Sequence, residues 1–151
     1  MIDSGAVAWV LASTALVMIM TPALGFFYGG LVRKKNVIST IVQTMTIFAV
    51  VSLVWALWGY SEAFGPSVGG VIGDLSKAGL NGVGGAPLGN QVIPELLYFA
   101  FQLKFAAITP ALIIGAFAER IRFKALLIFT VAWACADVMV VRCGSKRSFA
   151  H

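Results

Sequence analysis

Apolar residues follow one another in four long runs, at about residues 6–28, 37–60, 94–118 and 123–141. An α-helix rises about 1.5 Å per residue, so roughly 20 apolar residues cross a hydrocarbon core of about 30 Å. The first three runs are long enough, whereas the fourth is shorter and contains Asp137. The pattern predicts an all-α fold, a polytopic transmembrane helix bundle of about four spans.

Basic residues are concentrated in two short loops. Arg33, Lys34 and Lys35 follow the first run, and Arg120, Arg122 and Lys124 follow the third. The long second loop, residues 61–92, is rich in glycine, contains only Lys77 as a cation and is expected to be irregular. Because cytoplasmic loops carry the excess of Lys and Arg, the N-terminus is predicted outside. Trp55, Trp58 and Tyr60 agree, since they fall at the outer end of the second run.

The composition agrees with a membrane protein, because 60% of the residues are hydrophobic and 11% are charged. So few polar side chains cannot cover a water-facing surface, which predicts contact with a lipid bilayer. The net charge of +5 comes mainly from clusters beside the apolar runs, so it does not indicate a nucleic-acid partner. No Lys or Arg precedes the first run, which is therefore expected to be a retained span and not a cleaved signal.

Residues suited to metal, cofactor or enzyme chemistry are few. Cys135 and Cys143 lack CxxC spacing, and the single histidine, His151, is the last residue of the sequence. The sequence offers no nucleophile with a nearby base and no cluster of metal-ligand residues. We therefore expect no enzyme activity, no metal and no cofactor.

Long polar side chains also fall inside the apolar runs, where they are costly unless paired. Gln43 and Gln102 are expected to form interhelical hydrogen bonds, with a functional role as the alternative. Lys104 lies about ten residues into the third run. It can extend toward the outer interface or meet a carboxylate such as Glu95, and structural and functional roles are equally compatible with its position.

Phe101 and Phe105 are one helical turn apart, with Ile108 and Leu112 continuing the same face. Such a stripe is ordinarily the core of a helix bundle. If it lined a conduit, the aromatic faces would attract a small cation and block the hydrated ion, as a gate for a dehydrated or neutral species does. Periodicity leaves both alternatives open.

Small residues recur at helical spacing and predict close packing between helices in lipid. They are Gly25 and Gly29 in the first run, and Ala107, Ala111, Gly115 and Ala118 in the third.

Three stretches carry a resemblance to a known family. GFFYGGLVRKKNVIST (residues 25–40) and FQLKFAAITPALIIGAFAERIRFKA (residues 101–125) resemble the first and third helix segments of the ammonium transporter family (Amt/Mep/Rh). WALWGYSEAFG (residues 55–65) is similar to the end of that family's second helix. The similarity covers about residues 6–133, in the family's order and spacing. The resemblance implies a multi-pass protein of the cell membrane that moves ammonium or ammonia across the bilayer without a cofactor.

The fold implied by the resemblance has eleven spans, built as two inverted repeats and a last helix, and assembles as a homotrimer with one pore per subunit. Members of the family recruit ammonium at an outer vestibule, deprotonate it and pass ammonia through an apolar pore lined by two histidines. By motif match, Phe105 takes the position of an outer-gate phenylalanine. Phe101 takes the aromatic position one turn above it.

The chain departs from the family pattern after about Trp133, where it reads ACADVMVVRCGSKRSFAH. The family's vestibule tryptophan and both pore histidines have no counterpart in these residues, and the short basic tail at 142–151 would reach the outer side against the charge bias. We therefore expect the N-terminal portion of a truncated or frame-shifted transporter sequence, unable to transport by itself. The alternative is a non-transporting four-span membrane protein, or a defective truncated product, that at most packs with full-length relatives.

Overall fold

A computed structural model describes residues 2–68, 72–87, 89, 91–117 and 120–148, with backbone alone at 67, 68, 72 and 137–148. Ala118, His151 and the side chains of Asp137 and Cys143 therefore lie outside what the structure describes, as do the side chains of the tail at 142–151.

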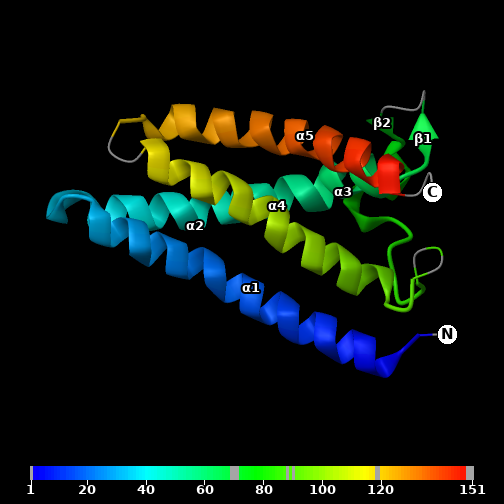
Figure 1. Ribbon diagram of the computed structural model, residues 1–151. Helices are drawn as coiled ribbons and strands as arrows, with labels where there is room; N and C mark the ends of the chain where they lie inside the picture. Colours follow the sequence, from blue (N-terminus) through cyan, green and yellow to red (C-terminus); the bar gives the residue numbers. More distant parts are fainter. Residues whose placement is uncertain (1, 69–71, 88, 90, 118–119, 149–151) are drawn as a thin grey trace.

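Four long helices run alternately up and down. They are α1 (Ser4–Leu31), α2 (Val37–Val54), α4 (Glu95–Phe117) and α5 (Phe123–Ser148). The N-terminus and the long loop between α2 and α4 lie at one end of the bundle, and the two short connections lie at the other (Figure 1). The protein is therefore an all-α helix bundle with both basic loops at the same end, as the alternating pattern predicts.

Three of the described helices are long and apolar enough to cross a membrane by length and composition: Ser4–Leu31, Lys34–Phe64 and Glu95–Phe117. In α5 the apolar stretch Phe123–Ala136 is shorter. The first three predicted spans therefore have helices of sufficient length, and the fourth span stays a prediction.

The second predicted span extends further than its apolar run suggests. A short 3-10 turn (Lys34–Asn36) leads into α2, and a π-helical turn (Trp55–Gly59) joins α2 to α3 (Tyr60–Phe64). The predicted end at residue 60 is thus four residues early. The helix continues because the polar Ser61 is 1% exposed and its hydroxyl donates to the Asp74 carbonyl oxygen at 2.6 Å. Helical backbone ends at Gly65, whose N–H donates to the Ser61 carbonyl oxygen.

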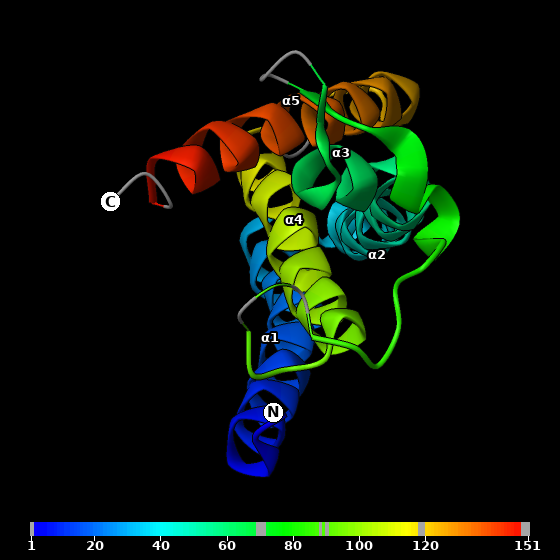
Figure 2. The ribbon, with the colours of Figure 1, turned by 90° about the vertical axis from the view of Figure 1, so that its right-hand side faces the viewer.

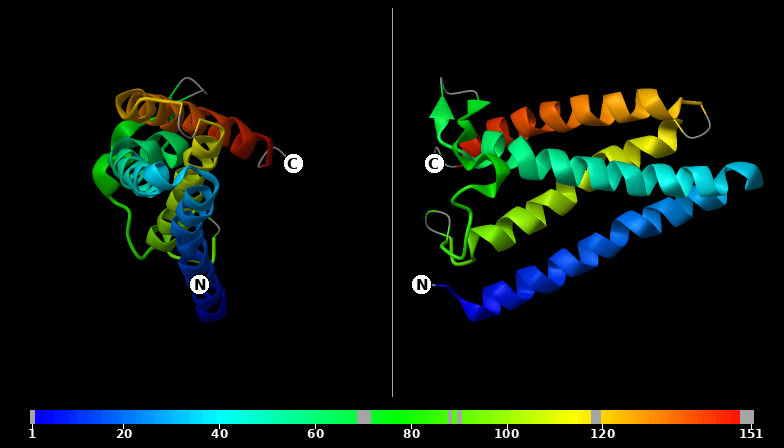
Figure 3. Two further views of the ribbon diagram at one scale, coloured as in Figure 1. Left: turned by 90° about the vertical axis from the view of Figure 1, so that its left-hand side faces the viewer. Right: turned by 180° about the vertical axis from the view of Figure 1, so that it is seen from behind.

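Glycines in α1 permit the close packing that the sequence predicts. Gly25 and Gly29 are buried, and a β-carbon added at Gly25 would lie 3.5 Å from Thr44 of α2. At Gly29 the same atom would lie 3.4 Å from Ile41. The α1 backbone thus approaches side chains of α2 directly, as small residues allow in lipid. Toward its N-terminal end α1 diverges from α2 (Figure 3).

Helix α4 lies between α1 and α5, with α2 alongside (Figure 2). Its fully buried Ala107 joins Ile47 and Val51 of α2 and Leu126 of α5 in the middle of the bundle. A second core cluster occupies the end near the long loop, where its members are Trp55, Tyr60, Ala63, Phe99 and Leu103.

Two of the aromatic residues at the end of the second predicted span lie in this core. Trp55 is 4% exposed and Tyr60 is 1% exposed. The ring of Tyr60 contacts those of Trp55 and of Phe99 on α4, because the π-helical turn and α3 pack against α4. Because Trp55 and Tyr60 pack in the core, they no longer argue for the predicted orientation. The basic loops still support it.

The long loop is more ordered than its glycine-rich sequence predicts. It contains a two-stranded antiparallel hairpin of β1 (Ser67–Val68) and β2 (Ile72–Gly73), followed by a 3-10 segment (Leu75–Leu80). Gly79 and Gly82 have φ angles of 64° and 75°, which glycine adopts without steric cost. Leu80 and Val83 pack against the core cluster beneath the loop, so the loop covers this end of α3 and α4.

Candidate functional site

The two phenylalanines predicted as an outer gate contact one another on α4. The ring centroids of Phe101 and Phe105 are 5.0 Å apart and the rings meet edge to face at 62°. Phe105 is 47% exposed, as is Leu112, whereas Ile108 is 6% exposed. Ile108 lies three residues after Phe105, about 60° around the helix, which turns it into the bundle. The stripe therefore divides, and Phe105 is not part of the bundle core within the described residues.

Within the part of the chain that the structure describes, the two intramembrane glutamines bond inside their own helices, contrary to the interhelical prediction. Gln102 Nε2 donates to the hydroxyl of Tyr98 at 3.2 Å, and Gln43 Nε2 lies 3.4 Å from the hydroxyl of Ser39. Both partners are four residues earlier, and side chains at this spacing are neighbours on a helix surface. Gln102 thereby fixes the polar end of Tyr98, one turn above itself.

Lys104 lies beside an aromatic ring and not beside Glu95. Its Nζ is 5.0 Å from the ring centroid of Phe48 on α2, within the range of a cation–π interaction. Glu95 is nine residues earlier on α4, about 13 Å along the helix, so its carboxylate is out of reach. The ring lets the ammonium group remain between α2 and α4 without an acidic partner.

Glu95 instead forms a polar cluster with the long loop. It is 6% exposed, and its Oε1 accepts a hydrogen bond from the hydroxyl of Tyr60 at 3.0 Å. The same oxygen forms an ion pair with Nζ of Lys77. Sequence reasoning missed this cluster, although Lys77 is the one cation of the loop and Glu95 follows the proline that begins the third run. A buried carboxylate requires such a partner.

Aromatic contacts connect this cluster to the predicted gate. The ring of Tyr60 meets that of Phe99 at a centroid distance of 5.2 Å and that of Phe64 at 5.1 Å. Phe64 in turn meets Tyr98 edge to face at 5.1 Å. Tyr98 accepts the hydrogen bond from Gln102, which follows Phe101 in the chain. A continuous set of contacts thus runs from the loop to Gln102, the residue that follows Phe101 in α4.

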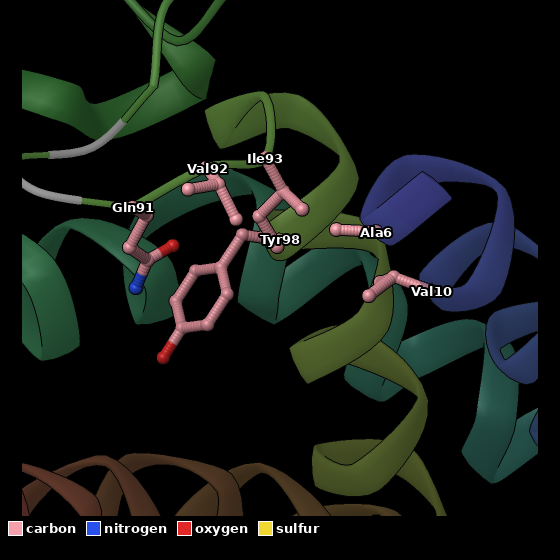
Figure 4. A pocket seen from close by; sticks show the side chains of 6 residues that line it. All are labelled: Ala6, Val10, Gln91, Val92, Ile93 and Tyr98. Atoms are coloured by element: carbon pink, nitrogen blue, oxygen red, sulfur yellow. The ribbon is translucent and has the colours of Figure 1, made fainter. Parts of the chain in front are cut away.

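A cavity of about 390 Å³ opens beside Tyr98. Its lining residues are Ala6, Val10, Gln91, Val92, Ile93 and Tyr98. The Tyr98 ring points away from Ala6 and Val10, and its hydroxyl lies at the far edge of the cavity (Figure 4). The N–H of Asp3 donates to the Val92 carbonyl oxygen at 3.0 Å, which joins the start of α1 to this part of the loop. The walls are largely apolar, and their polar groups come from Tyr98 and Gln91.

Among the described residues, no three His, Cys, Asp or Glu side chains gather in a way that could hold a metal ion. The side chains described on this part of α4 include aromatic rings and the Gln102 amide, and the face of an aromatic ring attracts a small cation.

Comparison with known proteins identifies the family. The model of the Ammonium Transporter Family matches residues 8–143. The chain belongs to the ammonium transporter family. An ammonium transporter of Bacillus subtilis is 51% identical over 120 residues, which cover 79% of this chain and 30% of that protein. An ammonium transporter of Mycobacterium tuberculosis is 43% identical and matches 87% of this chain and 31% of its own length.

Solved structures of the same family share the fold. The crystal structure of Candida albicans Mep2 superimposes on 93% of the chain with a TM-score of 0.82 and 30% identity. The crystal structure of Saccharomyces cerevisiae Mep2 covers 89% of the chain with a TM-score of 0.77 and 36% identity. The chain spans about 31% and 30% of these two proteins. It is thus a multi-pass member of a transporter family and corresponds to about a third of the relatives' length.

Proposed function

We propose that this chain forms the outer-gate part of a membrane pathway for ammonium or ammonia, with Phe105 as the gate residue and Phe101 as its aromatic neighbour. The observation that carries the proposal is the edge-to-face pair of rings on α4, with Phe105 47% exposed in a chain of the ammonium transporter family. A large aromatic ring held away from the bundle core is available to a solute beside α4.

The chemistry of the two rings suits selection of ammonium over neutral solutes and over larger hydrated ions. The face of an aromatic ring attracts a small cation by about 0.5 to 2 kcal/mol, depending on how far both are desolvated. The same apolar ring offers no oxygen ligands to replace the water around a metal cation. Ammonium is therefore recruited at Phe101, and the species that passes Phe105 is dehydrated or is neutral ammonia.

The intramembrane polar residues have supporting parts in this proposal. Gln102 donates a hydrogen bond to the hydroxyl of Tyr98, and Gln43 donates to the hydroxyl of Ser39 within α2. Lys104 places a positive charge between α2 and α4, which disfavours accumulation of cations inside the membrane and leaves ammonia unaffected.

Location, orientation and assembly complete the proposal. We place the protein in the cell membrane with the N-terminus and the long loop outside, because both basic loops lie at the opposite end of the bundle. A homotrimer with lipid around it follows from family membership. Supporting this, α1 leaves large apolar side chains uncovered, among them Trp9, Leu16 and Ile19, as a helix in contact with lipid or another subunit does.

A chimera tests the function directly. Residues 8–133, which keep the family pattern, replace the matching segment of the Bacillus subtilis ammonium transporter, and the chimera is expressed in cells without other ammonium transporters. We expect growth on low ammonium and uptake of labelled methylammonium. Phe105→Ala should lower uptake at limiting substrate by about 2- to 30-fold, the loss expected for one ring–cation contact.

The matched control is Leu112→Ala, equally exposed and two turns further along α4. It should leave uptake at limiting substrate near the unsubstituted level. A chimera that reaches the membrane but takes up no methylammonium contradicts the proposal. Expression of residues 1–151 alone should not rescue growth, since the sequence contains no histidine before His151 to line a pore. Rescue dependent on Phe105 would show instead that these residues form a complete pathway.

A further inference from the structure

Three parts of the chain meet at Glu95. The carboxylate comes from the first residue of α4, the hydroxyl of Tyr60 comes from the start of α3, and the ammonium group of Lys77 comes from the long loop. We call Lys77, Glu95 and Tyr60 the outer clasp. Glu95 and Tyr60 are 6% and 1% exposed, and the Lys77 side chain is 21% exposed. Lys77 thus lies between solvent and the two buried residues of the clasp.

The backbone around the clasp is held at the same place. The N–H of Lys77 donates to the hydroxyl of Ser61 at 3.0 Å, so this residue is bound through both its main chain and its side chain. On the other side of the loop, the N–H groups of Glu95 and Leu96 donate to the carbonyl oxygens of Ala86 and Gly84. These bonds join Lys77 to α3, and Gly84 and Ala86 of the glycine-rich stretch to the start of α4.

Loss of the cation leaves an unfavourable arrangement. A buried carboxylate whose partner has been removed is strongly destabilised, because its Coulombic attraction is gone while its desolvation remains. The loop offers no second cation, since Lys77 is the only Lys or Arg in residues 61–92. Glu95 must then take up a proton or be reached by water, and in either case the ion pair that ties the loop to α4 is gone.

The clasp and the gate residues share α4. Tyr60 packs on Phe99, four residues after Glu95, and the Phe64–Tyr98 contact leads to Gln102. Phe101 lies between Phe99 and Gln102 in the chain and contacts the ring of Phe105. Phe101 takes no part in the contacts with α3 described above, so a shift of α3 reaches its ring through the α4 backbone between Phe99 and Gln102.

We propose that Lys77 is a positioning residue, which through Glu95 and Tyr60 holds the long loop on the outer end of α4 and thereby fixes the ring of Phe101. The gate role of Phe101 rests on the proposed function, whereas the positioning itself does not require transport. Neither Lys77 nor Glu95 touches the gate rings in this assignment, and both act through the packing of α3 on α4.

Two measurements on the full chain in lipid nanodiscs test this inference. Hydrogen–deuterium exchange reports on the amides of Lys77, Glu95 and Leu96. A ¹⁹F label, introduced as 4-fluorophenylalanine in place of Phe101, reports on the ring. In Lys77→Met we expect exchange at these amides to rise by at least about tenfold and the ¹⁹F resonance to broaden or split. Lys77→Arg keeps the charge and should restore both signals.

A second variant changes Glu95, the partner of Lys77. It keeps the inference testable if Lys77→Met fails to fold. Glu95→Gln keeps an acceptor for Tyr60 but removes the charge, and it should raise exchange at the amides of Lys77 and Leu96. The double variant should show no larger effect than the stronger single one, because both substitutions remove the same interaction. Lys34→Met removes an equal charge from an exposed position at the far end of the bundle and should change neither signal.

Each result decides between stated outcomes. Unchanged amide exchange in both Lys77→Met and Glu95→Gln overturns the clasp. Faster exchange with an unchanged ¹⁹F resonance confines the clasp to the loop and overturns the positioning of Phe101. Faster exchange together with an altered resonance that Arg restores supports the inference. Methylammonium uptake by the chimera is measured separately, so a failure of the proposed function is not confused with any of these results.

Discussion

Replacing Gly65 by alanine should destabilise the end of the bundle that the long loop covers. Gly65 follows α3 and has φ −71° and ψ 166°, a backbone conformation that alanine adopts without strain. The added β-carbon, however, would overlap the carbonyl oxygen of Ser61 and lie 2.6 Å from that of Asp74. Both obstacles are backbone atoms, which cannot rotate away as a flexible side chain can.

Two effects oppose one another in this substitution, and their magnitudes give the sign. Alanine restricts the unfolded chain and by itself stabilises by about 0.4–1 kcal/mol where the native conformation is compatible. Overpacking of a closely packed site costs about 1–3 kcal/mol. Relief of the overlap also moves the Asp74 carbonyl away from the Ser61 hydroxyl, which now donates to it at 2.6 Å. We therefore expect a net loss of about 1–2 kcal/mol.

Thermal unfolding of the purified chain in detergent measures this loss by far-ultraviolet circular dichroism. For a chain of this size, about 1 kcal/mol lowers the midpoint by roughly 2–4 °C, so Gly65→Ala should lower it by about 2–8 °C. Gly85→Ala is the matched control, because it lies in the same loop, has no atom within 4 Å of the added β-carbon and lacks a positive φ. Its midpoint should stay the same or rise slightly.

One outcome refutes the reasoning. If Gly65→Ala unfolds at or above the midpoint of the unsubstituted chain, the turn between Ser61 and Asp74 opens at negligible cost. The loop would then not be held on α3 in the way these contacts require. A drop of equal size in Gly85→Ala would instead show that any alanine in the loop is unfavourable, independent of the overlap.

Three further predictions concern the rest of the bundle. Gly115→Ala should lower the free energy of unfolding by only about 1 kcal/mol. The added β-carbon meets the ring of Tyr28, which can turn aside if its hydroxyl gives up the 3.2 Å hydrogen bond to the Leu112 carbonyl oxygen. A midpoint shift as large as that of Gly65→Ala would contradict this. Ile47 is fully buried between α2 and α4, and Ile47→Ala should lower the free energy of unfolding by about 1–2 kcal/mol. This is less than in a water-soluble core, because in a membrane the side chain leaves lipid and not water when the helices pack. Unchanged thermal stability would exclude tight packing at this site. In a cysteine-free background, Ser76→Cys should react with an impermeant maleimide on intact cells and Lys34→Cys only after lysis, and the reverse pattern would overturn the predicted orientation.

Much of the bundle could be predicted from the sequence because membrane helices must satisfy their own backbone hydrogen bonds in lipid. Long apolar runs therefore specify the helices at Ser4–Leu31 and Glu95–Phe117 to within a few residues. The glycines at positions 25 and 29 likewise specify where α1 approaches α2, because only small residues allow such contact. Apolar runs and small residues at helical spacing are local properties, so both can be recognised as periodic patterns in the sequence.

The partners of polar side chains could not be predicted in the same way. Lys104 could meet a carboxylate by sequence separation alone, but helix length puts Glu95 out of reach and the crossing of α2 and α4 supplies Phe48 instead. Trp55 and Tyr60 read as interface residues from their place in the run, whereas a π-helical turn and the covering loop bury them. The exposed fraction of each residue depends on elements far away in the sequence.

The helical membrane class and the short basic loops can be predicted from the sequence, and the family resemblance predicts the gate positions for Phe101 and Phe105. Only the tertiary structure decided that the glycine-rich loop folds back over α3 and α4, and that Lys77 reaches Glu95 across eighteen positions. The physical reason is that hydrophobic periodicity is written along each helix, while the pairing of a buried charge depends on which chain segments meet in space.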